Sequence, residues 1–221
     1  SGPETTQDLH PDTIFNNRIT EIIRESNIEK KEKLYRQLLK DFQPDGSDFR
    51  KERFKNVHTS LALFWSSRGN PAKFLEYYNQ VREGIHMGLG SAFASGLVRS
   101  KAYKEALMVL DDIRKDVENS LNNNGSLYTY LQVFNNYALA YYNLGQKQEA
   151  LQHIRMAWDK SDKKDMQVNS TYATVLHGLN KHAEALPIME DLAKRGMATE
   201  DIKRLYRDSY VKNGGDAAAF N

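Results

Sequence analysis

The segment from Asn135 to Ala157 carries small residues where two helices could cross. Ala138 precedes a glycine, Gly145, and Ala150 follows it, and glycine is typical of a tight turn between helices. Helix axes approach to about 8–10 Å only where no bulky side chain stands at the crossing. The segment is therefore predicted to form a helical hairpin, with Tyr141 filling the space beside the crossing.

The same markers return at a fixed spacing along the chain. Ala138 and Ala173 are 35 residues apart, and so are Ala150 and Ala185. Two markers that keep one period indicate a repeated unit. Besides the hairpin above, the alignment gives three units, marked by Ala62, Trp65, Gly69 and Phe74, by Ala94, Leu97, Ala106 and Leu110, and by Ala173, Leu176, Ala185 and Met189.

This pattern resembles the tetratricopeptide repeat. The resemblance implies an all-α fold, a right-handed α-α superhelix of helical hairpins in which each hairpin buries a face against the next. The pattern departs from the family between the second and third units, where the marker spacing grows to 44 residues. The excess is predicted to be a long helix through Asp111–Leu121, followed by a loop at 122–126.

Three- and four-residue spacing of apolar side chains continues between turns, so no strand is expected. We predict a disordered or tag-derived N-terminus (1–11), a helix pair with a loop (12–48), about four hairpins (49–197), and a C-terminal capping helix with a tail (198–221). The helix pair is expected at Asp12–Ser26 and Ile28–Phe42, before a loop at 43–48. The capping helix is expected to run from about Thr199 to Lys212.

A second resemblance covers roughly residues 130–221. The segments Glu184–Pro187, Leu192–Thr199 and Leu205–Lys212 are similar to the helical region beside thioredoxin-like domains in envelope thiol-disulfide oxidoreductases of Gram-negative bacteria. Gly196 is expected to end one helix and Thr199 to cap the next. The chain has no cysteine, so none of that family's redox residues carries over.

The second resemblance favours the periplasm or cell envelope as the location. Ser1-Gly2-Pro3 is typical of a cloning remnant, so we expect the signal peptide to be missing from the printed sequence. A formal net charge of +2 disfavours nucleic acid as a partner, because no broad positive field is expected. The longest apolar runs, such as Leu61–Trp65, are too short for a membrane span.

No residues emerge as catalytic, cofactor-binding or metal-binding candidates, and we expect neither an enzyme nor a cofactor. His177 and His182 are five residues apart, a spacing that puts them on different faces of a continuous helix, and a turn at Asn180 lies between them, so a metal site is not expected there. The acidic pairs Asp111–Asp112 and Glu200–Asp201 are expected to be solvated. The segment Gly84–Gly90 lacks the strand and lysine of a phosphate loop, which favours a loop or close helix packing.

Repeat geometry implies that the first helix of each hairpin lines a concave groove. Amides and hydroxyls around an aromatic side chain there suit an extended peptide, whereas a clamp for carboxylates would need several cations. A solvated face without a partner is the alternative. The predicted partner-binding residues are Asn56, Arg99, Gln132, Asn135, Tyr142, Asn143, Thr174 and His177.

The function expected from this groove is a non-catalytic scaffold that binds a protein or a peptide. The alternative is an accessory helical domain that positions a linked or partner thioredoxin-like oxidoreductase. Solute binding for carbohydrate uptake is a third reading, which is disfavoured because the chain lacks the long loop-rich half of the repeat proteins that do this.

Overall fold

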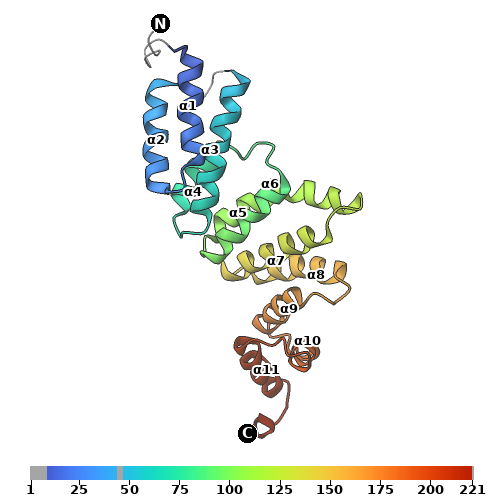
Figure 1. The fold of residues 1–221 in the computed structure, drawn as a ribbon. Helices are drawn as coiled ribbons and strands as arrows, with labels where there is room; N and C mark the ends of the chain where they lie inside the picture. Colours follow the sequence, from blue (N-terminus) through green and yellow to red (C-terminus); the bar gives the residue numbers. More distant parts are fainter. Residues whose placement is uncertain (1–8, 44–46, 221) are drawn as a thin grey trace. The chain divides into compact units, whose positions relative to one another are not determined.

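The computed structural model describes residues 9–43 and 47–220, and these residues form an all-α fold without strands (Figure 1). The all-α prediction is confirmed. Residues 1–8 of the predicted N-terminus, 44–46 of the predicted loop, and Asn221 lie outside the described residues. The helices are α1 (Pro11–Arg24), α2 (Ile28–Asp41), α3 (Asp48–Ser66), α4 (Pro71–Tyr78), α5 (Met87–Arg99), α6 (Tyr103–Asn122), α7 (Leu127–Asn143), α8 (Lys147–Lys160), α9 (Met166–Gly178), α10 (His182–Lys194), α11 (Glu200–Lys212) and the short 3-10 helix η2 (Ala217–Phe220).

The chain divides into two compact units, Ser1–Gly84 and Ile85–Asn221. In the first unit, α3 contacts α1, α2 and α4. Phe15 of α1, Phe54 of α3 and Phe74 of α4 are each at most 2% exposed. The helix α3 is therefore the centre of this unit, and the other helices bury their apolar faces against it.

The N-terminal helix pair forms at the predicted place, and both helices end earlier than predicted. The helix α1 begins at Pro11. Proline suits the first position of a helix because the N–H that it lacks would have no partner there. The helix α2 begins after Asn27, whose side chain accepts a hydrogen bond from the backbone of Lys30. The pair ends at Arg24 and Asp41, against the predicted Ser26 and Phe42.

The second unit consists of three hairpins and a closing helix in chain order (Figure 1). The hairpins are α5–α6, α7–α8 and α9–α10, and the helices of each pair contact each other. The helix α7 also contacts α5, α6 and α9. Each hairpin thus packs on the next, as expected of a helical repeat, whereas the right-handed sense of a superhelix stays a prediction.

One turn geometry closes all three hairpins of this unit. The backbone N–H of Gln146 donates to Tyr141 at 2.9 Å, and the matching bonds join Ala102 to Leu97 at 2.8 Å and Lys181 to Leu176 at 2.9 Å. Their acceptors are 44 and 35 residues apart, the same steps as the sequence markers. The residue before each donor has a positive φ, and the three are Lys101, Gly145 and Asn180.

The predicted insertion is present as the long helix α6, which continues through 111–121 and ends at Asn122. Asn124 follows with a φ of 62°, and Gly125 donates to the carbonyl of Ser120. Within this hairpin, a Cβ at Gly90 of α5 would lie 2.4 Å from the side chain of Ile113 of α6. Gly90 therefore permits close packing of α5 on α6, as the sequence favoured.

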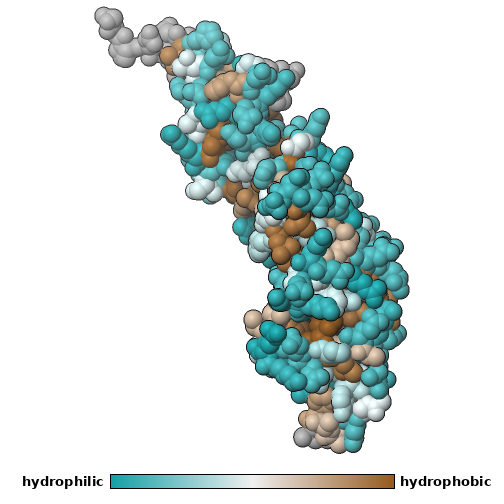
Figure 2. All heavy atoms as spheres, turned by 90° about the vertical axis from the view of Figure 1, so that its right-hand side faces the viewer, coloured by the Kyte–Doolittle hydropathy of each residue, from teal (hydrophilic) through white to brown (hydrophobic). Residues whose placement is uncertain are grey.

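The C-terminal boundaries follow the predicted chemistry. Gly196 has a φ of 69° after α10, and the side chain of Thr199 accepts a hydrogen bond from the backbone of Ile202 at the start of α11. In the part of the chain that the structure describes, no helix has the length and apolar character that crossing a membrane requires. On the face drawn in Figure 2, hydrophobic residues form separate small patches among hydrophilic ones.

Candidate functional site

The helices α5, α7 and α9 form what we call the A layer of the second unit. The helix α7 contacts α5 of the preceding hairpin and α9 of the following one. The second helices α6 and α8 also pack against α7. Seven of the eight predicted partner-binding residues lie on these three helices. The eighth, Asn56, is an exposed residue of α3 in the first unit.

Hydrogen bonds between side chains join α5 to α7 in the A layer. The hydroxyl of Ser91 donates to the side-chain oxygen of Gln132 at 3.2 Å, and the amide of Asn136 donates to the hydroxyl of Ser95 at 3.0 Å. Gln132 and Asn136 are four residues apart, so they lie on one stripe of α7. This stripe is the side of α7 that meets α5.

Asn135 is the predicted residue with the most unusual surroundings. Its side chain is 3% exposed, and its Oδ1 has no hydrogen-bond partner among the described residues. A buried amide oxygen without a partner costs about 1–3 kcal/mol, and such groups are few in native proteins. Asn135 thus holds an unused acceptor within the A layer.

Tyr142 lies two helical turns beyond Asn135 on the same stripe of α7. A Cβ at Gly178 would come within 2.5 Å of the Tyr142 hydroxyl, so the ring of Tyr142 lies against the backbone of α9. The Nζ of Lys147 is 5.7 Å from the centre of this ring and donates to the carbonyl of Gly178 at 3.1 Å. Tyr142 is half-buried and joins α7 to α9, and the stripe that it shares with Asn135 faces α9.

Three further predicted residues have no side-chain bond to another helix within the described ranges. The amide of Asn143 donates to the backbone carbonyl of Leu139, and the hydroxyl of Thr174 donates to the backbone carbonyl of Ser170. Each bond is 2.8 Å long and lies within one helix. Arg99 is exposed at the end of α5. These side chains remain at the surface of their helices, and their role in binding stays a prediction.

His177 differs from the other predicted residues because it pairs with the closing helix. Its Nε2 lies 2.6 Å from Oδ2 of Asp208, which Lys212 also contacts at 3.0 Å. The ring of His182 lies edge-on at 5.3 Å between centroids, and its Nδ1 is 2.8 Å from the hydroxyl of Ser209. On one continuous helix the five-residue spacing would separate the side chains of His177 and His182, but the turn between α9 and α10 brings their rings together.

Ionic and hydrogen-bonding partners shift the pKa values in this cluster. Hydrogen bonds from His177 and Lys212 lower the pKa of Asp208. Burial first, and then electrostatic repulsion from its cationic neighbours, Lys212 among them, lowers the pKa of His182. The cluster therefore ties α11 to α9 and α10 by polar contacts, and α9 and α10 each contact α11.

The remaining candidates of enzyme chemistry have structural partners. The sequence predicted that Asp111 is only solvated. In the structure it accepts a hydrogen bond from the hydroxyl of Tyr137 at 2.7 Å. Glu200 and Asp201 are exposed and pair with Lys203 and Arg204. Among the residues that the structure describes, no group of three or more His, Asp or Glu side chains could hold a metal ion.

Sequence reasoning missed a partly buried network beside Tyr137. Arg114 of α6 contacts Nε2 of His153 at 2.9 Å, while Nδ1 of His153 lies 2.7 Å from the carbonyl of Glu149, to which it donates. The guanidinium of Arg114 also lies 5.4 Å from the ring centre of Tyr137. These contacts join residues as far as 39 positions apart, and no local motif indicates them.

A scan against protein-family models finds no match for this chain, and a search of curated proteins finds none either. The likeness to a tetratricopeptide repeat therefore rests on the spacing of the markers and on the repeated turn.

Proposed function

We propose that this chain is a non-catalytic scaffold that binds a protein or a peptide through the A layer. The observation that carries the proposal is the unpaired acceptor of Asn135, which is buried on α7 in the A layer. A group that costs free energy in the unbound protein gains the most when a ligand supplies its partner. A backbone N–H of an extended peptide is a donor of the right kind.

Neutral polar groups elsewhere in the A layer support the same ligand. The hydroxyls of Ser91 and Ser95 and the amides of Gln132 and Asn136 each retain hydrogen-bonding capacity beyond the one bond that they make. A peptide backbone offers one donor and one acceptor per residue and carries no charge. Amides and hydroxyls therefore fit it better than a ligand that needs cations.

The test begins with a random peptide library displayed on phage, from which binders to the purified chain are selected. A selected peptide is then labelled, and its affinity is measured by fluorescence anisotropy for the unmodified protein and for Asn135→Leu. We expect about fivefold weaker binding, equivalent to about 1 kcal/mol, because the apolar isostere cannot accept a hydrogen bond. The free energy of unfolding should stay the same or rise, since no bond is lost in the free protein.

Two control variants make this result specific. Asn136→Leu removes a hydrogen bond that the structure shows, and it should lower the free energy of unfolding by about 1 kcal/mol. Replacement of Lys160 and Lys163 by alanine, at the exposed end of α8, should leave the affinity unchanged. Selected peptides whose affinity ignores Asn135→Leu would contradict the proposal, and so would a library that yields no binder.

A further inference from the structure

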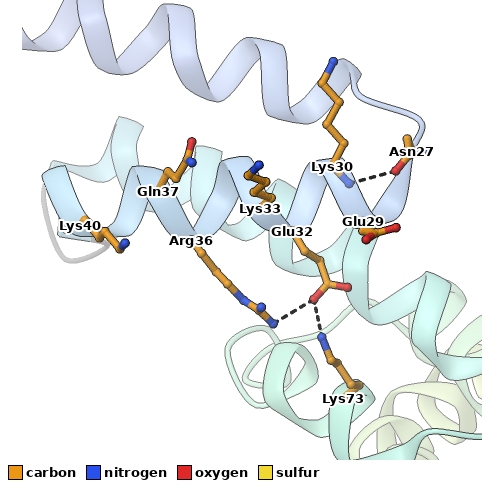
Figure 3. A pocket seen from close by; sticks show the side chains of 9 residues that line it. All are labelled: Asn27, Glu29, Lys30, Glu32, Lys33, Arg36, Gln37, Lys40 and Lys73. Atoms are coloured by element: carbon orange, nitrogen blue, oxygen red, sulfur yellow. Dashed lines mark hydrogen bonds and ion pairs between the residues drawn. The ribbon is translucent and has the colours of Figure 1, made fainter.

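The helix α2 carries a row of exposed cations in the first unit. Lys33, Arg36 and Lys40 are three and four residues apart, so they lie on one face of the helix with Gln37 between them (Figure 3). The row extends about 10 Å along the helix axis at a rise of about 1.5 Å per residue. With neighbouring residues it lines a groove of about 710 Å³.

A buried carboxylate at the edge of this groove anchors two of its cations. Glu32, whose side chain is 8% exposed, accepts hydrogen bonds from Trp65 at 3.1 Å, Lys73 at 2.7 Å, Tyr77 at 2.7 Å and Arg36 at 3.4 Å. Burial alone would raise the pKa of Glu32, but the hydrogen bonds from Lys73, Tyr77 and Trp65 outweigh it and lower the pKa. The charge of Glu32 is thus compensated within the protein by Arg36 and Lys73, which lie beside it.

The groove keeps a positive charge after these pairs are counted. Its lining has five cationic side chains and the two carboxylates of Glu29 and Glu32, which gives a net charge of +3. Lys30 is paired with Glu25 at 3.3 Å. Lys33 and Lys40 have no carboxylate within 4 Å in the described part of the chain, so their charges are available to a partner.

We propose that this groove on α2 binds an acidic peptide segment of a partner protein. The charge complementarity is local, since the whole chain has a formal charge of only +2. None of the nine lining residues is aromatic, so the groove offers no surface on which nucleobases could stack. The proposal concerns a different unit from the A layer and does not depend on peptide binding there.

The spacing of the cations fits an extended chain. Carboxylates on alternate residues of such a chain are about 7 Å apart, so two of them lie within reach of Lys33 and Lys40. Arg36 lies between these lysines in the sequence, and its Nη2 is the atom that bonds to Glu32, so the other in-plane N–H groups of its guanidinium can donate to a carboxylate. The amide of Gln37 can pair with the peptide backbone.

The experiment uses a fluorescein-labelled peptide of alternating glutamate and glycine, with anisotropy measured on the full chain at low ionic strength. We expect binding that weakens as salt is added, because the contacts are exposed ion pairs. The double variant Lys33→Glu and Lys40→Glu should bind at least about tenfold more weakly. Both side chains are exposed, and circular dichroism should show an unchanged helical content.

The matched control is Lys51→Glu with Lys55→Glu, which makes the same change of charge at exposed positions of α3 in the same unit. It should alter the affinity by less than about twofold. An equal loss in both variants would show an effect of net charge alone and would overturn the proposal. The proposal also fails if the peptide does not bind, or if single-stranded RNA or vesicles of anionic lipid bind through Lys33 and Lys40 more tightly than the peptide does.

Discussion

His58 lies among aromatic rings in the first unit. Its side chain is 5% exposed, and it shares a hydrogen bond with the hydroxyl of Tyr35. The rings of Phe54 and Tyr77 stack on it at 6.4 and 6.3 Å between centroids. Burial lowers the pKa of His58 from 6.5 to about 4, because a charged imidazolium would lose its hydration there.

We predict that His58 remains neutral in the folded protein until the pH falls to about 4. Between pH 6.5 and about 4 the unfolded chain binds a proton that the folded chain does not, so the contribution of His58 to stability decreases as the pH falls. Over this window the loss should reach roughly 3 kcal/mol. The check is a titration of the histidine ring signals by NMR, together with urea unfolding at several pH values.

The variant His58→Gln identifies the signal and removes this group from the pH dependence. His153 and His182 in the second unit also have lowered pKa values, and burial is the main cause for both. Part of the acid sensitivity should therefore persist in the variant. A His58 signal that titrates near 6.5 would show that the ring is hydrated, and the described burial would then be wrong.

At the scale of elements, the crossing of α7 and α8 depends on small side chains. Ala138 and Ala150 are fully buried at 0% exposure, and Ala173 and Ala185 are buried equally in the next hairpin. We predict that Ala138→Leu lowers the free energy of unfolding by roughly 1–3 kcal/mol, because the added methylenes force the packed helices apart. Thermal unfolding followed by circular dichroism measures the effect.

The control for this substitution is Ala92→Leu, at an exposed position of α5 in the same unit. It adds the same atoms without overpacking, so the melting temperature should stay within the error of the measurement. Equal effects of the two variants would remove Ala138 from the helix crossing.

The helices were predictable from the sequence where their limits depend on local chemistry. Gly145 and Thr199 mark a turn and a helix start by properties of single residues, and both lie where they were predicted. Lys101 closes an equivalent turn with a φ of 65° although lysine gives no local signal for it. The pair of His177 with Asp208 could not be predicted, because the two residues are 31 positions apart and meet only through the packing of α11 on α9.

At the scale of the whole molecule, the two proposed binding surfaces belong to different compact units. The groove on α2 lies entirely within Ser1–Gly84, and the A layer lies within Ile85–Asn221. The predicted groove combines Asn56 of the first unit with seven residues of the second unit, and its continuity across the two units stays a prediction. The residues described around the groove on α2 belong to the first unit, and the contacts described in the A layer belong to the second.

We therefore predict that a fragment of residues 85–221 folds alone and retains the peptide binding of the A layer. Its helices α5–α11 contact one another in chain order, and its core includes fully buried apolar residues such as Phe134 and Leu176. A chain of this length can bury enough apolar surface for independent stability, whereas residues 1–84 are closer to the lower limit. Circular dichroism should show a cooperative helical fold, and a peptide selected on the full chain should bind the fragment within about twofold of the original affinity. A fragment that folds but loses the peptide would place an essential contact in the first unit, where Asn56 would become the first residue to substitute.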